Sequence, residues 1–118
     1  MRNYKNFEVW KEGVTIVKDI YQLTNTFPTK EIYGLQNQMR RAAVSIPSNI
    51  AEGSSRNSDK EFKRFLEISL GSLFELDTQL ILSEQLNYIS KNNFDKISDC
   101  INKEQRKLIN FIIKLKSV

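Results

Sequence analysis

Four lysines near the carboxyl end of the chain repeat at a spacing that places them on one side of a helix. Separations of 7, 4 and 7 residues join Lys96, Lys103, Lys107 and Lys114. At about 100° per residue, these side chains project within roughly 40° of one another. Such a stripe of ammonium groups can follow a phosphate backbone, with an affinity that depends strongly on salt and little on base sequence. A solvated flank whose lysine stems cover the edge of the core gives the same pattern.

A second group of polar residues lies in the segment GSSRNSDKEFKR, residues 53–64. The segment places several hydroxyl groups beside four basic side chains: Arg56, Lys60, Lys63 and Arg64. Together with the N–H groups of a helix start, they could hold a phosphate. Ser58 and Glu61 also form a capping box, which explains most of the same residues through helix capping.

The residues that most enzymes use are missing or scattered. The chain has no histidine, no glycine-rich phosphate loop and a single cysteine, Cys100. Without a second cysteine or a histidine, Cys100 is expected to pack as a small hydrophobic side chain. The carboxylates are dispersed in the pattern of a solvated helix surface. We therefore expect no catalytic residue, no metal site and no cofactor.

Length and composition favour one domain over residues 1–118. The chain is 40% hydrophobic and carries a formal net charge of +4, with eighteen Lys and Arg against fourteen Asp and Glu. Residues 89–118 hold seven basic and three acidic side chains, whereas residues 57–88 hold three and six. No apolar run approaches the roughly 20 residues that span a bilayer, so we expect a soluble, cytoplasmic protein without membrane contact.

The candidate side chains belong to, or lie next to, four stretches in which an apolar residue occurs at every third or fourth position. The spacing predicts helices over about residues 7–24, 30–52, 59–87 and 91–115. Thr29, Ser58 and Ser90 are the expected N-caps. Because the connections are short, the simplest packing is an all-α, antiparallel up-down-up-down four-helix bundle.

The second of these stretches contains a proline, Pro47. A proline inside a helix cannot donate the backbone hydrogen bond of its position. The apolar residues Met39, Ile46 and Ile50 nevertheless keep one phase across it. We therefore predict a single helix, kinked at Pro47, with Gly53 as its C′ residue.

Two of the helices carry apolar residues away from their core stripe. The candidates for contacts between subunits are Tyr33, Arg40, Val44 and Pro47 in the second helix and Leu70, Phe74 and Ile81 in the third. A lone bundle needs one buried face per helix, so a second apolar face indicates oligomerisation. A wide core stripe is the alternative.

The sequence resembles a known family over about residues 7–89. Characteristic segments, in order, are FEVWKEG, YGLQNQMRRAAVSIPSNIAEGSSR, KEFKRFLEISLGSLFELDTQL and LNYI. They resemble the four-helix bundle proteins encoded in intervening sequences of bacterial 23S ribosomal RNA genes. The family motif falls on Arg40, Arg41, Pro47, Asn49, Glu52 and Gly53.

That family is similar in fold to the accessory variability determinant of diversity-generating retroelements. This determinant is a basic pentameric bundle that binds nucleic acid and works with a reverse transcriptase. The resemblance implies a homopentamer of antiparallel four-helix bundles, with nucleic-acid binding as the suspected activity and no enzymatic activity.

Two hypotheses follow. The first is a non-catalytic homo-oligomer that binds RNA or DNA backbone through basic stripes, with candidate residues Arg40, Arg41, Arg56, Lys96, Lys103, Lys107 and Lys114. The second is a protein-interaction module that docks a partner protein through Arg40, Val44 and the acidic third helix. Steep salt dependence of binding separates the first hypothesis from the second.

Overall fold

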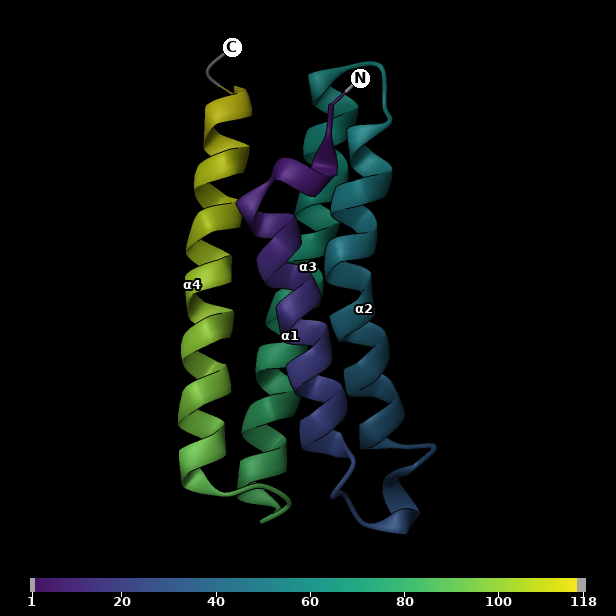
Figure 1. The fold of residues 1–118 in the computed structure, drawn as a ribbon, viewed down its shortest axis with the longest axis vertical. Coiled ribbons are helices and arrows are strands. Elements are labelled where there is room, and N and C mark those ends of the chain that lie inside the picture. Colours follow the sequence, from purple (N-terminus) through teal and green to yellow (C-terminus); the bar gives the residue numbers. More distant parts are fainter. Residues whose placement is uncertain (1, 117–118) are drawn as a thin grey trace.

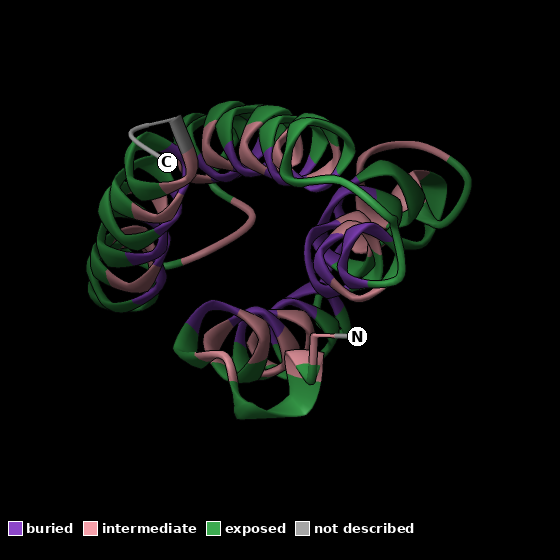
Figure 2. Cartoon of the chain, turned by 90° about the horizontal axis from the view of Figure 1, so that it is seen from above, coloured by how far each residue is buried: buried purple, intermediate pink, exposed green. Residues whose placement is uncertain are grey.

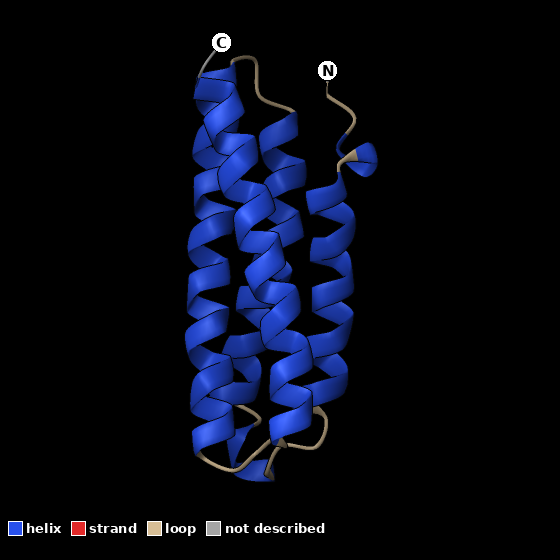
Figure 3. Ribbon diagram, turned by 90° about the vertical axis from the view of Figure 1, so that its left-hand side faces the viewer, coloured by secondary structure: helices blue, strands red, loops and turns tan. Residues whose placement is uncertain are grey.

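The computed structural model describes residues 2–116 as a bundle of four long helices (Figure 1). They are α1 (Glu8–Thr24), α2 (Leu35–Ser54), α3 (Asp59–Gln85) and α4 (Lys91–Lys116), with the single-turn helices η1 (Tyr4–Asn6) and η2 (Thr29–Glu31). Successive helices run in opposite directions along a molecule of 46 × 23 × 19 Å. Residues 2–116 contain no strand (Figure 3), so the predicted all-α four-helix fold is confirmed.

The core lies on the common axis of the four helices. Viewed along that axis, the buried side of each helix turns inward (Figure 2). Ile16 of α1, Ile46 of α2, Leu73 of α3 and Ile101 of α4 are each 1% exposed or less. This arrangement follows from the apolar spacing of each helix, because burying the stripes removes apolar surface from water at about 25 cal/mol per Å².

Two of the predicted helix starts are confirmed and one is wrong. The Ser58 hydroxyl accepts a hydrogen bond from the Glu61 N–H (3.2 Å), and Ser90 caps α4 in the same way. The second helix begins at Leu35 and not after Thr29. There the carboxylate of Glu31 accepts from the Leu35 N–H (3.0 Å), so a side chain of the preceding turn caps the helix.

Helix α2 continues through Pro47 to Ser54. This continuity was predicted, and the kink at Pro47 stays a prediction. Gly53 is inside the helix and buried, and it has no positive φ, so its predicted role as the C′ residue is wrong. A Cβ at Gly53 would lie 2.5 Å from the Cβ of Phe65. The position therefore needs glycine because α3 approaches so closely.

Small polar side chains join α2 to α3. The Ser69 hydroxyl donates to the carbonyl of Ile46 (2.9 Å), and the hydroxyls of Ser45 and Ser72 are 2.9 Å apart. Both bonds require the two helix backbones to lie close together. Helices α2 and α3 accordingly form the most extensive of the four interfaces.

The interface between α1 and α4, called here the α1–α4 seam, is the sparsest of the four. At one end, Phe7 and Phe111 close it with ring centroids 5.2 Å apart. Further along the seam, charged and polar side chains such as Asp19 and Lys96 lie among apolar ones such as Leu23 and Ile97. None of the described helices is long and apolar enough to cross a membrane.

Candidate nucleic-acid interface

The four lysines predicted to form a stripe lie on the edge of α4 that borders the α1–α4 seam, and all four are exposed. Lys96 lines a cavity together with Asp19 of α1. Lys107 and Lys114 line a groove of about 560 Å³ with Glu8 of α1. Acidic side chains of α1 therefore face part of the stripe, which lowers its positive potential below that of an isolated row of lysines.

The arginines at the loop between α2 and α3 are held in fixed positions. Arg56 forms an ion pair with Glu52 (3.1 Å), and its guanidinium lies over the ring of Phe65, 4.7 Å from the centroid. Arg2 donates a hydrogen bond to the Arg56 carbonyl (2.9 Å) and pairs with Asp59. Sequence reasoning missed Arg2 because it reaches this loop from the other end of the chain, where no spacing pattern includes it.

The two arginines of the family motif have different roles. Arg40 donates to the Thr24 hydroxyl (2.9 Å) and to the Asn25 side-chain oxygen (2.9 Å), and it lies over the ring of Tyr21. It thereby fixes the carboxyl end of α1 on α2. Arg41 is exposed and makes no hydrogen bond or ion pair with the part of the chain from 2 to 116. Only Arg41 of this pair is available to a phosphate.

The remaining motif residues are explained by packing around α2. The Asn49 amide donates to the carbonyl of Ser45 (2.8 Å), one turn earlier. Pro47 is buried against α1, and Gly53 allows the close approach of α3. Glu52 forms an ion pair with Arg56 of the following loop. Most of this motif therefore builds the bundle, and Arg41 is the one member that points a charge into solvent without a partner among the described residues.

Positive charge concentrates at one end of the molecule. The chain start, the α2–α3 loop and the carboxyl end of α4 lie together there (Figure 1). Residues 2–12, 47–68 and 105–116, called here the basic end, hold eleven Lys and Arg against six Asp and Glu. Residues 13–46 and 69–104 hold seven against eight. Phe62 of α3 and Phe111 of α4 pack edge to face at 5.6 Å, which places the start of α3 beside the end of α4.

The sequence-predicted cations are divided between these two halves. Arg56, Lys107 and Lys114 lie at the basic end, whereas Arg40, Arg41, Lys96 and Lys103 lie in the other half. Lys103 is engaged by Asp99 (3.0 Å). The basic end also includes Lys60 and Arg64, both exposed on the first turns of α3. Both belong to the segment 53–64, which the sequence indicates as a candidate phosphate site.

The candidates for subunit contacts differ in exposure. Tyr33 (93% exposed), Val44, Phe74 (49%) and Ile81 present apolar surface to solvent. Leu70 is half-buried and packs against the core.

Pro47 departs from this set. It is buried within the subunit, where it meets α1 at Gly13, and a Cβ at that glycine would lie 3.4 Å from the Pro47 Cβ. Its predicted place on a subunit-contact face is therefore wrong. It shares a helix side with Val44, but the neighbouring helix covers that side at Pro47 and leaves it open at Val44.

Sequence reasoning missed a buried carboxylate in the α1–α4 seam. Glu104 is 1% exposed, and neither carboxylate oxygen has a hydrogen-bond partner within residues 2–116. Burial raises its pKa to about 8, the nearby Glu12 adds to the rise, and Lys107 opposes it. The sequence does contain a sign of this burial, because Glu104 occupies a position in the apolar spacing that Ile101 and Leu108 define.

The thiol of Cys100 lies one turn before this carboxylate. Burial raises its pKa, and the charges of Asp19, Asp99 and Glu12 raise it further. The thiol therefore stays protonated at neutral pH, and a protonated thiol is a poor nucleophile.

The fold and its charged end define an all-α, antiparallel four-helix bundle with one basic end. The chain matches the family model described as 23S rRNA-intervening sequence protein over residues 5–110, and it belongs to this family. The family resemblance found in the sequence is thereby confirmed.

A solved protein structure is similar to this chain over most of its length. It is a protein of unknown function from the S23 ribosomal protein family of Bacteroides thetaiotaomicron VPI-5482. The TM-score is 0.80 at 22% sequence identity, and the match covers 88% of this chain and 97% of that one. At this identity, the likeness supports the fold alone. A search of curated proteins gave no match.

Proposed function

We propose that the protein is a non-catalytic homo-oligomer that binds the phosphate backbone of RNA or DNA at its basic end. The concentration of cations at one end of the bundle carries this proposal: eleven basic against six acidic side chains. Non-specific affinity for nucleic acid comes from neutralised phosphates and released counterions, so clustered charge matters more than net charge. A formal charge of +4 spread evenly would attract a polyanion weakly.

Two arginines of the basic end are ordered by neighbouring side chains while keeping part of each side chain exposed. Arg56 and Arg2 are each held by an ion pair and by an aromatic ring. A guanidinium that is already ordered loses less side-chain entropy when it meets a phosphate. The neighbouring lysines on α3 and α4 add further positive charge around this pair.

Exposed apolar side chains support the oligomer. Four of those on α3 are between 40% and 49% exposed: Ile68, Phe74, Ile81 and Leu82. Leu86, which directly follows the helix, is 53% exposed. A monomer gains nothing from apolar surface on the solvent side of a helix, whereas a subunit contact buries it. We propose that subunits meet through α3, in the pentamer that the family resemblance implies. Joining subunits also multiplies the number of basic ends that one nucleic acid can contact.

Binding is tested by fluorescence anisotropy with mixed-sequence RNA and DNA over a salt titration. The double variant Lys60→Gln/Arg64→Gln should weaken binding and lower the log–log salt slope by about two for each subunit that contacts the nucleic acid. The matched control Lys18→Gln/Lys30→Gln removes two exposed charges from the other half and should change little. Equal effects of the two double variants, or no binding at low salt by the intact oligomer, would refute the proposal.

The oligomer is tested by light scattering. Phe74→Glu and Ile81→Glu should each lower the measured mass while circular dichroism stays unchanged, because both side chains lie outside the core. Thr15→Glu, on the exposed side of α1, is the control. A wild-type chain that is monomeric at micromolar concentration would rule out the assembly. A partner protein that stays bound after nuclease treatment and in moderate salt would favour the protein-interaction alternative.

A further inference from the structure

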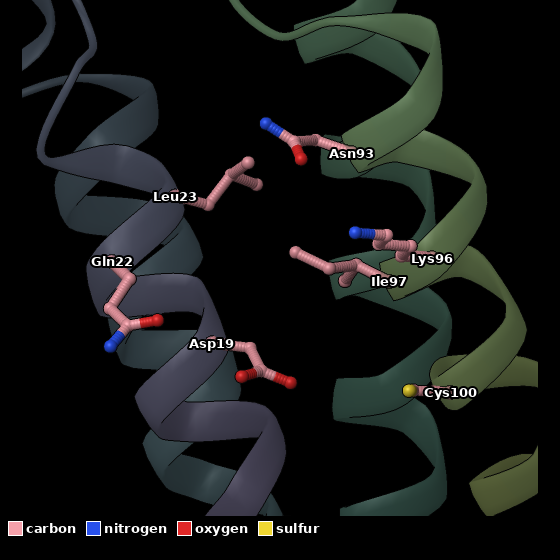
Figure 4. Close-up of a pocket in the computed structure, with 7 residues that line it drawn as sticks. All are labelled: Asp19, Gln22, Leu23, Asn93, Lys96, Ile97 and Cys100. Atoms are coloured by element: carbon pink, nitrogen blue, oxygen red, sulfur yellow. The ribbon is translucent and has the colours of Figure 1, made fainter.

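The α1–α4 seam contains a cavity of about 320 Å³ whose walls come from two different helices (Figure 4). Its lining residues are Asp19, Gln22 and Leu23 of α1 and Asn93, Lys96, Ile97 and Cys100 of α4. In Figure 4, Asp19 and Leu23 point toward α4, while Lys96 and Ile97 point toward α1. Small-molecule pockets usually measure about 300–1,000 Å³, so the cavity has room for a small ligand only.

Opposite charges face this cavity from opposite walls. Asp19 is half-buried on α1 and Lys96 is exposed on α4, and neither makes a hydrogen bond or ion pair with residues 2–116. Burial raises the pKa of Asp19 above its ordinary value, and Glu12 adds to the rise against the opposing effect of Lys18. A half-buried carboxylate without a partner is energetically unfavourable, and a cation placed against it relieves the cost.

The rest of the lining complements these two charges. Asn93, one turn before Lys96, provides an amide that both donates and accepts. Leu23 of α1 and Ile97 of α4 are buried and provide apolar surface in the same cavity. The thiol of Cys100 is neutral and adds no charge, because burial raises its pKa. The cavity therefore combines a cationic group, an amide, an apolar wall and an anionic group.

We propose that this cavity binds a free α-amino acid with an apolar side chain. Its ammonium group pairs with Asp19, its carboxylate pairs with Lys96 and accepts from the Asn93 amide, and its side chain packs on Leu23 and Ile97. A simple amine or a simple carboxylic acid satisfies only one of the two charged walls. The cavity lies in the half of the bundle away from the basic end, so this site is independent of the nucleic-acid proposal.

The experiment is a nuclear magnetic resonance titration of the full chain with L-leucine, L-methionine and L-valine. Amide shifts should localise to residues 19–23 and 93–100. The analogues 4-methylpentanoic acid and 3-methylbutylamine each lack one charged group of leucine and should bind at least about tenfold more weakly, since a hydrogen bond to a charged group contributes about 1.5–3 kcal/mol.

Two variants test the assigned groups. Asp19→Asn and Lys96→Gln should each weaken binding of the best amino acid by at least about tenfold. Lys91→Gln, on the same helix outside the cavity, is the matched control and should leave affinity unchanged. Lys96 is exposed, so its variant stays interpretable even if Asp19→Asn disturbs folding. The proposal is overturned if none of the three amino acids binds at millimolar concentration, or if the one-charge analogues bind equally well.

Discussion

The carboxylate of Glu104 makes a measurable prediction about stability and pH. Its pKa is about 8 in the folded chain, against an ordinary value of 4.5. Between these two values the folded state keeps a proton that the unfolded state loses, so the free energy of unfolding falls as pH rises. The slope is about 1.4 kcal/mol per pH unit, and the accumulated loss at pH 7 is about 3 kcal/mol. Below pH 4.5 the full stability is present, because both states are protonated.

Glu104→Gln should remove this dependence while keeping the shape of the side chain. The protonated acid and the amide are both neutral, so the variant and the wild type should be similar in stability near pH 5. By pH 7 the variant should be more stable by about 3 kcal/mol. The measurement is urea unfolding followed by circular dichroism from pH 5 to 8, at fixed protein concentration because an oligomer unfolds in a concentration-dependent way.

The control for this experiment is Glu67→Gln, which neutralises an exposed carboxylate of α3. It should keep the slope of the wild type. A wild-type stability that does not change between pH 5 and 8 would show that Glu104 is not buried as the structure has it. So would a Glu104→Gln variant that retains the wild-type slope.

Further predictions concern the helix contacts around α2. Gly53→Ala should lower the free energy of unfolding by about 1–3 kcal/mol, because the new Cβ would overlap Phe65 and force α3 outward. Gly71→Ala, where the added Cβ meets nothing within 4 Å, should instead raise it by about 1 kcal/mol through helix propensity. Arg40→Ala should cost about 1–3 kcal/mol and loosen the end of α1, whereas Arg41→Ala should leave stability unchanged. Chemical denaturation measures the free energy of unfolding of all four variants. Equal effects of Gly53→Ala and Gly71→Ala, or of Arg40→Ala and Arg41→Ala, would contradict these contacts.

The helices could be predicted from the sequence because each has a strong apolar period. The capping serines Ser58 and Ser90 also define two starts by local chemistry alone. The start of α2 was missed because its cap is the side chain of Glu31, itself held by the Tyr88 hydroxyl at 2.7 Å. That bond joins residues 57 positions apart, and no local pattern includes it.

The candidate site was harder to predict than the fold, because its properties depend on which helices are neighbours. The spacing of the α4 lysines was enough to put them on one edge, but not to show that acidic side chains of α1 face it. The sequence makes both Arg40 and Arg41 candidates for phosphate contacts, and only the position of α1 shows that Arg40 is bound to the end of that helix. The helical spacing places Pro47 on the same outer side of α2 as Val44, but α1 covers Pro47 at Gly13.

The sparse seam between α1 and α4 also determines how the bundle opens. Helix α4 is anchored on one side by α3 and on the other by an interface that contains Asp19 and Glu104. Neither carboxylate has a hydrogen-bond or ion-pair partner in the described part of the chain. Partial unfolding begins where the fewest contacts must be broken, so α4 should detach before α1, α2 and α3 separate. Its amide hydrogens should then exchange with solvent at a lower free energy than those of α2. Any molecule that bridges the seam would raise the free energy needed to detach α4. Its binding would therefore slow the exchange of the α4 amide hydrogens with solvent.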